Sequence, residues 1–180
     1  MMTVVTLVCA TICILALVES VCLFLGKFLR VWKYVIKACP EEELVDISSM
    51  DGEHETFLGL VNVKLKDYQQ KKLLGWCCEV TVSIDMKNKT EEDISQQAMF
   101  LVKKLDAVLR RQSKSIPYPL VTGCLVGDNA YKVYWQVRTP EEVERLLNNL
   151  QTDAQMSFVL REDRFWVGYS KLLSMLHEEN

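Results

Sequence analysis

The strongest constraint on this chain is an apolar run at its N-terminus. Residues 4–25 read VVTLVCATICILALVESVCLFL, and Glu19 is the only charged residue among residues 1–26. A helix of these 22 residues, rising ~1.5 Å per residue, covers the ~30 Å hydrocarbon core of a bilayer. The run therefore predicts a single transmembrane anchor over residues 1–26.

A cleaved signal peptide is the alternative interpretation of the same run. Val18 and Ser20 resemble the small residues that precede a cleavage site. However, no basic segment precedes the run, and the apolar residues continue through 21–25, past that site. These two features favour an uncleaved signal-anchor.

Basic residues follow the run directly, and residues 27–39 are expected to form a basic juxtamembrane helix. Its cations fall on one stripe at helical spacing, and Trp32 suits the headgroup region. The expected membrane-surface residues are Lys27, Arg30, Trp32, Lys33 and Lys37. Because these positive charges lie only on the C-terminal side, the positive-inside rule predicts a single-pass protein whose C-terminal domain is cytoplasmic. In that orientation, the acceptor sequence at Asn88 would not be glycosylated.

Glu19 stands inside the predicted span, where an ionised carboxylate costs ~2 to 3 kcal/mol at most depths. It either snorkels or is protonated, or it bonds to a partner helix. Small residues beside it would let two helices approach closely. The predicted intramembrane partner contact consists of Cys9, Cys13, Ala16, Glu19 and Ser20.

An acidic segment separates the membrane region from the rest of the chain. Residues 41–55 hold seven acidic residues and no Lys or Arg, which favours a solvated linker over residues 40–55. Residues 56–180 are expected to form one α+β domain. Within it, residues 56–74 fit a helix and a strand equally well.

From Trp76 onward, the hydrophobic pattern predicts alternating strands and helices. Strands are expected at 76–85, 120–126, 131–137, 155–160 and 164–169, and helices at 90–112, from Thr139 to Leu150, and at 172–176. This order is β-α-β-β-α-β, which is typical of a ferredoxin-like two-layer sandwich. Thr90, with Asp93 three residues on, is expected to cap the helix at 90–112, and Thr139, with Pro140 and Glu142, is expected to cap the next helix. The last strand and helix would form a C-terminal extension.

The sequence contains no recognisable catalytic, cofactor or metal motif. His54 and His177 stand apart, and the glycine motifs of phosphate-binding loops and nucleophile elbows are missing. Cys77 and Cys78 are adjacent in a predicted strand and would face opposite ways, with Cys78 in the core and Cys77 on the surface. A net charge of -3 gives no reason to expect a nucleic acid partner. No cofactor, metal or catalytic residue is therefore expected.

The two central strands of the expected sheet suggest a binding face. One face would be covered by the helices, and the other would remain open, with acids on one strand opposite bases on its neighbour. The predicted partner face consists of Glu79, Asp85, Lys132, Tyr134, Gln136 and Arg138. The alternatives are a solvated sheet face, or packing of residues 56–74 on it.

Three functional hypotheses follow. The leading one is a membrane-anchored, non-enzymatic adaptor that holds a cytoplasmic α+β domain at a bilayer to recruit or stabilise a membrane protein partner. The second is an extracytoplasmic module resembling the SEA type, with Asn88 glycosylated. The third is an enzyme without a recognisable motif.

Cys22 and Cys39 are additional candidates for acylation near the membrane.

Overall fold

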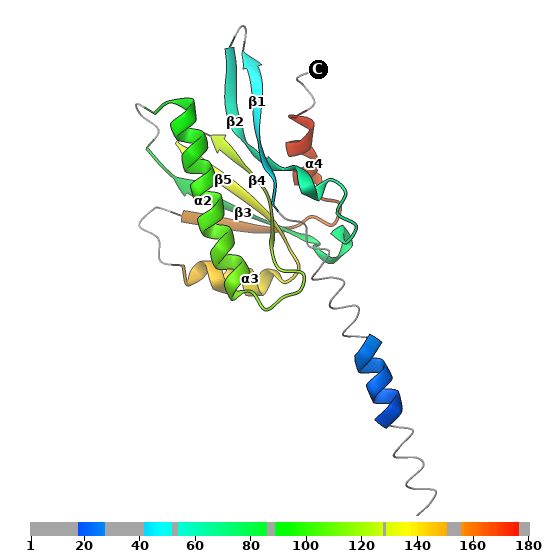
Figure 1. The fold of residues 1–180 in the computed structure, drawn as a ribbon. Helices are drawn as coiled ribbons and strands as arrows, with labels where there is room; N and C mark the ends of the chain where they lie inside the picture. The colour runs from blue at the N-terminus through cyan, green and yellow to red at the C-terminus, as the bar shows by residue number, and fades with distance from the viewer. Residues whose placement is uncertain are drawn as a thin grey trace, which may run out of the picture. The chain divides into compact units, whose positions relative to one another are not determined.

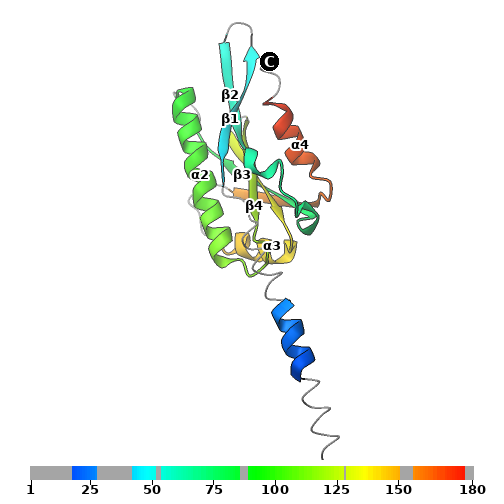
Figure 2. The same ribbon diagram turned by 45° about the vertical axis from the view of Figure 1, so that its right-hand side comes forward.

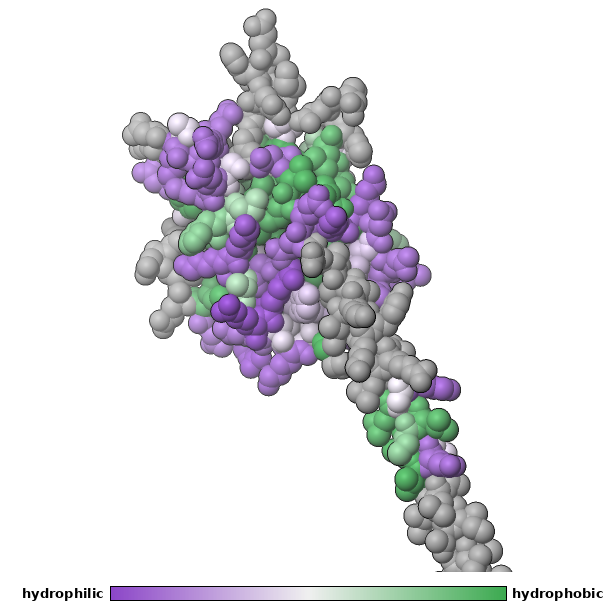
Figure 3. Space-filling model, in the orientation of Figure 1, coloured by the Kyte–Doolittle hydropathy of each residue, from purple (hydrophilic) through white to green (hydrophobic). Residues whose placement is uncertain are grey.

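The computed structural model describes residues 18–27, 42–51, 54–85, 89–127, 129–150 and 156–176, and the chain divides after Ala38 into two compact units. In the first unit, residues 18–27 form a helix whose apolar side chains are exposed, with Phe24 at 72%. Figure 3 shows these apolar residues gathered on the short helix. No helix within the described ranges has the length and hydropathy to cross a bilayer. The remaining residues of the predicted anchor lie outside those ranges.

The second unit is a mixed α+β fold built on one antiparallel sheet. Its strands are β1 (Leu44–Asp51), β2 (His54–Asn62), β3 (Trp76–Ser83), β4 (Leu120–Gly127), β5 (Ala130–Val137) and β6 (Met156–Glu162). Its helices are α2 (Glu91–Gln112), α3 (Pro140–Asn148) and α4 (Val167–Ser174), and two 3-10 turns are η1 (Val63–Leu65) and η2 (Lys71–Leu73). The strand order in the sheet is β1-β2-β4-β5-β3-β6 (Figure 1). The segment β3-α2-β4-β5-α3-β6 reproduces the predicted element order.

The helices α2 and α3 cover one face of the sheet and enclose the larger core. The inward faces predicted for β3 and β5 are confirmed, since Val80 and Trp135 are fully buried in this core with Leu105 of α2 and Val143 of α3. The Trp135 indole also donates a hydrogen bond of 3.2 Å to the Asp106 carboxylate of α2. Hydrophobic burial on this face therefore fixes the register between helices and sheet.

The start of α2 has the predicted cap. The Thr90 hydroxyl accepts a hydrogen bond of 3.2 Å from the Asp93 backbone N–H, and the Asp93 carboxylate accepts one of 3.0 Å from the Thr90 backbone. Aspartate thus completes the capping box despite its shorter side chain. The helix ends at Gln112, in agreement with the end predicted before Pro117 and Pro119.

The start of α3 differs from its prediction. Thr139 precedes the helix, but its side chain makes no capping hydrogen bond. The Glu142 carboxylate, which would complete a capping box, instead accepts hydrogen bonds from the Ser115 backbone at 3.1 Å and the Ser113 hydroxyl at 3.2 Å. Glu142 therefore ties α3 to the loop that follows α2.

A second, smaller core lies on the opposite face of the sheet. Figure 2 shows the sheet between α2 on one side and α4 on the other. The core joins side chains of β1, β2, η1, the flanks of η2, β4 and α4; its buried members are Ile47, Val61, Leu65, Tyr68, Leu74, Leu120, Trp166, Tyr169 and Leu172. Gly123 permits this contact, because a Cβ there would lie 3.0 Å from Leu172 and 2.4 Å from the Leu60 carbonyl. The prediction that this face is uncovered is therefore wrong for the part beneath α4.

The acidic segment also differs from its prediction. A solvated linker is expected over residues 40–55, but the structure places β1 there, paired antiparallel with β2. Ile47 is only 1% exposed, because it packs in the second core. In the ambiguous stretch 56–74, β2 continues to Asn62 and the two 3-10 turns follow. The strand pattern thus applies to its first part only.

The strand predicted at 164–169 is wrong. There, the chain turns after β6 and begins α4 at Val167, which also makes the terminal helix longer than predicted. The Asp163 carboxylate accepts hydrogen bonds from the Val167 and Gly168 backbone N–H groups at 2.8 and 3.3 Å. These bonds satisfy first-turn donors that a helix leaves unpaired, so Asp163 stabilises a helix start here.

Candidate functional site

The predicted partner face is divided into a covered and an open part. In the covered part, Gln136 is 1% exposed and donates a hydrogen bond of 2.9 Å to the Asp163 carboxylate. Cys77 lies opposite Gln136 in the β3–β5 register and is 2% exposed. The segment that leads from β6 into α4 therefore removes Gln136 from any partner surface.

The open part lies along the outer half of the same face, on β3, β5 and β6. Glu79 is flanked in the register by Tyr134 on β5 and Val159 on β6. Val159 is 58% exposed, and Glu79 forms an ion pair of 3.3 Å with Arg161. We call the residues of this surface the open sheet face: Glu79, Thr81, Ser83, Lys132, Tyr134, Ser157, Val159 and Arg161.

The remaining members of the predicted face lie at its margins. Asp85 is exposed just after β3, and Arg138 is exposed just after β5, with its guanidinium donating to the Ile116 carbonyl. Tyr134 is only partly exposed, and burial raises the pKa of its hydroxyl to about 12. Tyr134 is therefore neutral, and only part of its side chain is accessible to a partner.

The cysteines of β3 are both internal. Cys78 is fully buried, as predicted, but Cys77 is buried as well, so the prediction of a surface thiol is wrong. Burial raises the pKa of the Cys77 thiol to about 11 and that of the Cys78 thiol to about 12. Neither thiol is a ready nucleophile, because the thiolate is the reactive form.

A buried acid in α2 is the most strongly perturbed carboxyl group among the described residues. Burial raises the pKa of Asp106 to about 7; a hydrogen bond with the Glu42 carboxyl adds to the rise, and the Arg110 guanidinium opposes it. Arg110 forms ion pairs with both acids. Because Glu42 is the first described residue of the domain, this cluster fastens the chain to α2 where the domain begins.

The predicted membrane residues are described only in part. Glu19, Ser20 and Lys27 lie in the helix 18–27 and are all exposed. Cys9, Cys13, Ala16, Arg30, Trp32, Lys33 and Lys37 lie outside the described residues, as do Asn88, Cys39 and His177. The intramembrane contact and the juxtamembrane helix therefore stay predictions.

The described residues include two exposed apolar side chains that the sequence did not predict, and no candidate metal site. Among them, no group of three His, Cys, Asp or Glu side chains is placed to hold a metal ion. The exposed residues that sequence reasoning missed are Phe165 and Val167, 89% and 53% exposed in the turn after β6. Their apolar pattern predicts a strand, and no local signal indicates that the turn points them outward.

Comparison of the chain with protein-family models, with curated proteins and with solved structures finds no match. The functional interpretation therefore depends on the residues and geometry described above.

Proposed function

We propose that this chain is a membrane-anchored, non-enzymatic binding or assembly module with a cytoplasmic α+β domain. The observation that carries the proposal is the helix 18–27, which belongs to a compact unit of its own. Leu23 and Phe24 are 67% and 72% exposed in it. Exposing such apolar side chains to water is unfavourable, whereas the hydrocarbon core of a bilayer accommodates them without that penalty.

For the domain, we propose a ferredoxin-like core extended by the β1–β2 hairpin and by α4. In support, β5 and β3 are central antiparallel neighbours, flanked by β4 and β6. Both crossover helices, α2 and α3, pack in one core. The topology itself does not fix a function, so the binding role depends on the open sheet face.

We further propose that a membrane protein partner binds the open sheet face, assisted by Glu19 within the bilayer. This face carries both signs of charge at Glu79 and Lys132, around an exposed apolar side chain at Val159. A mixed polar rim around an apolar contact is the usual composition of a protein interface. Holding the domain at a bilayer would raise the effective concentration of a membrane partner on this face.

The test is the topology of the full chain carrying a C-terminal epitope tag, in intact microsomes. Extraction with alkaline carbonate should leave the protein in the membrane pellet, because a transmembrane helix is not released by charge neutralisation. External protease should remove the tag, since the domain is expected on the cytoplasmic side.

Other outcomes separate the alternatives. A tag protected from protease, together with a glycosidase-sensitive shift that disappears in Asn88→Gln, would contradict the cytoplasmic orientation and favour the SEA-like alternative. Release of the uncleaved chain by carbonate would contradict the anchor. Appearance of a shorter, secreted chain would instead establish a cleaved signal peptide.

A further inference from the structure

Three exposed apolar side chains from two distant segments share one end of the domain. Phe165 is 89% exposed, Val167 53% and Leu73 37%. We call these three residues the apolar tip. The Trp166 indole donates hydrogen bonds to the Leu74 carbonyl at 2.9 Å and the Lys71 carbonyl at 3.2 Å. These bonds hold η2, which contains Leu73, against the turn that contains Phe165.

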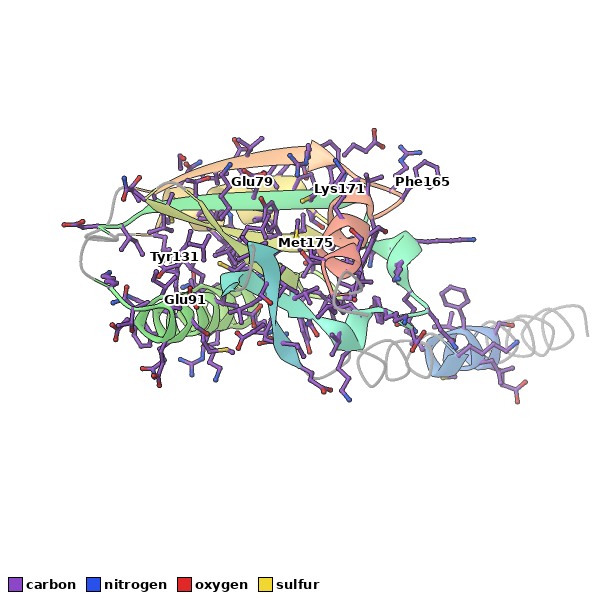
Figure 4. All side chains as sticks on the ribbon, turned by 90° about the horizontal axis from the view of Figure 1, so that it is seen from above. Glu79, Glu91, Tyr131, Phe165, Lys171 and Met175 are labelled. Atoms are coloured by element: carbon purple, nitrogen blue, oxygen red, sulfur yellow. The ribbon has the colours of Figure 1, made fainter. Side chains whose placement is uncertain are left out.

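The backbone of this turn is fixed in a conformation that directs Phe165 outward. Trp166 has φ 56° and ψ 39°, a left-handed conformation that bulky residues rarely adopt. Its side chain is only 2% exposed and packs edge-on against the Tyr169 ring, with the ring centroids 5.7 Å apart. Figure 4 shows Phe165 pointing away from the domain, at the end opposite Glu91. Phe165 is therefore presented by a well-packed turn rather than by a loose loop.

Basic side chains lie at the same end of the domain as the apolar tip. Lys66, Lys72 and Lys171 are exposed and have no ion-pair partner within the described ranges, whereas Arg164 pairs with Glu162. Lys171 lies one helical turn after Val167 on α4, and Figure 4 shows it near Phe165. The other exposed acids of this end are Asp67 and Glu43, and Glu43 pairs with Lys64. This end therefore has an excess of positive charge, although the whole chain has a net charge of -3.

The chain joins the domain at the same end. The Val63 backbone N–H donates a hydrogen bond of 3.0 Å to the Glu43 carbonyl, and the side chains of Glu43 and Lys64 form an ion pair of 2.6 Å. These contacts place the start of β1 beside η1, and Figure 1 shows both near the start of α4. The apolar run of the predicted anchor ends at Leu25, so residues 26–41 connect this run to Glu42. Sixteen residues reach at most ~55 Å when extended, which is an upper limit on the distance between the predicted span and the start of β1.

We propose that the apolar tip docks on the anionic leaflet of the membrane that anchors the chain, with Phe165 in the interfacial region and Lys66, Lys72 and Lys171 among the lipid phosphates. This inference depends on the proposed function, since the anchor supplies the nearby bilayer. Apolar side chains ringed by lysines bind anionic interfaces through area burial and charge together. The cytoplasmic leaflet carries the required negative charge. Docking would orient the domain and hold the open sheet face at a defined height above the membrane.

The experiment places the photoreactive residue p-benzoylphenylalanine at Phe165 in the full chain, reconstituted into phosphatidylcholine vesicles with or without phosphatidylserine. Phe100 is the matched control position, because it is 69% exposed but lies on α2, which covers the opposite face of the sheet. After illumination, mass spectrometry counts lipid adducts at each position. A parallel sample is washed with alkaline carbonate to measure anchoring independently.

We expect lipid adducts at position 165 in excess of those at position 100 by about tenfold. Removing phosphatidylserine, or changing Lys66, Lys72 and Lys171 to Gln, should reduce the adducts at 165 by roughly fivefold or more. Carbonate-resistant protein without excess adducts at 165 would overturn docking but leave the anchor intact. Adducts to protein instead of lipid at 165 would also overturn it and identify the tip as a protein contact. If carbonate releases the protein while lipid adducts persist at 165, the result contradicts the anchor but supports docking of the tip. If carbonate releases the protein and no lipid adducts form at 165, the result contradicts both the anchor and the docking.

Discussion

The indole nitrogen of Trp166 lies 2.9 Å from the carbonyl oxygen of Leu74, across a separation of 92 residues in the chain. This hydrogen bond joins the turn before α4 to the segment before β3. The second core is completed around it, since Tyr169 and Leu65 pack in the same cluster. Trp166 thus links the C-terminal extension to the segment that leads into β3.

We expect Trp166→Ala to lower the free energy of unfolding by about 3 to 5 kcal/mol, because it removes a buried aromatic side chain and its hydrogen bonds. Phe165→Ala, one residue away, should change it by less than about 0.5 kcal/mol, because Phe165 is exposed. Denaturant unfolding followed by tryptophan fluorescence or circular dichroism measures both. Equal effects of the two substitutions would contradict the assigned burial.

Asp106 should make stability depend on pH. Burial, assisted by Glu42, raises the pKa of its carboxyl group to about 7, whereas in the unfolded chain the pKa is near ~4. The folded protein therefore binds more protons between these values, so the free energy of unfolding should fall as pH rises from ~4 to ~7. Because the two pKa values differ by about three, we expect a contribution of up to about 4 kcal/mol, absent in Asp106→Asn. Urea unfolding across this range measures it, and parallel profiles for the two proteins would contradict the prediction.

The internal cysteines should resist alkylation in the folded protein. Cys77 is 2% exposed and burial raises its pKa to about 11, so both access and thiolate population are low. We expect iodoacetamide to modify Cys77, Cys78 and Cys124 at least about tenfold more slowly in native than in denatured protein. Peptide mapping by mass spectrometry assigns each site. Rapid native labelling of Cys77 alone would indicate that the segment between β6 and α4 opens readily.

The two predicted helix caps provide a matched pair of threonines. Thr90→Ala should destabilise the protein by about 1 kcal/mol, because it removes the hydroxyl that caps α2. Thr139→Ala should lower the free energy of unfolding by less than about 0.5 kcal/mol, because the Thr139 hydroxyl makes no capping hydrogen bond. Thermal or denaturant unfolding of the two variants gives the comparison. A larger loss for Thr139→Ala would show that it stabilises α3 in another way.

The open sheet face can be tested without disturbing the cores. We expect Lys132→Glu with Val159→Ser to change the free energy of unfolding by less than about 1 kcal/mol, because both side chains are exposed. The double change should nevertheless reduce proximity labelling of a membrane partner by the full chain severalfold. Phe100→Ser with Lys103→Glu, on the exposed side of α2, is the matched control. Identical labelling by the wild type and the Lys132 and Val159 variant would contradict the proposed binding face.

The elements that could be predicted from sequence are those with a local signal. The alternation in β3 and β5, the spacing in α2 and the Thr90 and Asp93 capping box each lie within one continuous segment, so their neighbours in sequence suffice to identify them. The same local patterns predict the larger core, because it forms between faces that are apolar in every element involved.

The second core could not be predicted in this way, because its parts come from distant segments. β1 lies in an acidic stretch and is held by pairing with β2, and Cys77 and Gln136 are buried only because the turn after β6 folds over them. That turn depends on Asp163 meeting the start of α4 and on Trp166 reaching Leu74. The sequence by itself thus determined the helical face of the sheet, where each element carries its own periodicity. Only the tertiary structure decided which part of the other face stays open, because burial there results from long-range contacts that no local pattern records.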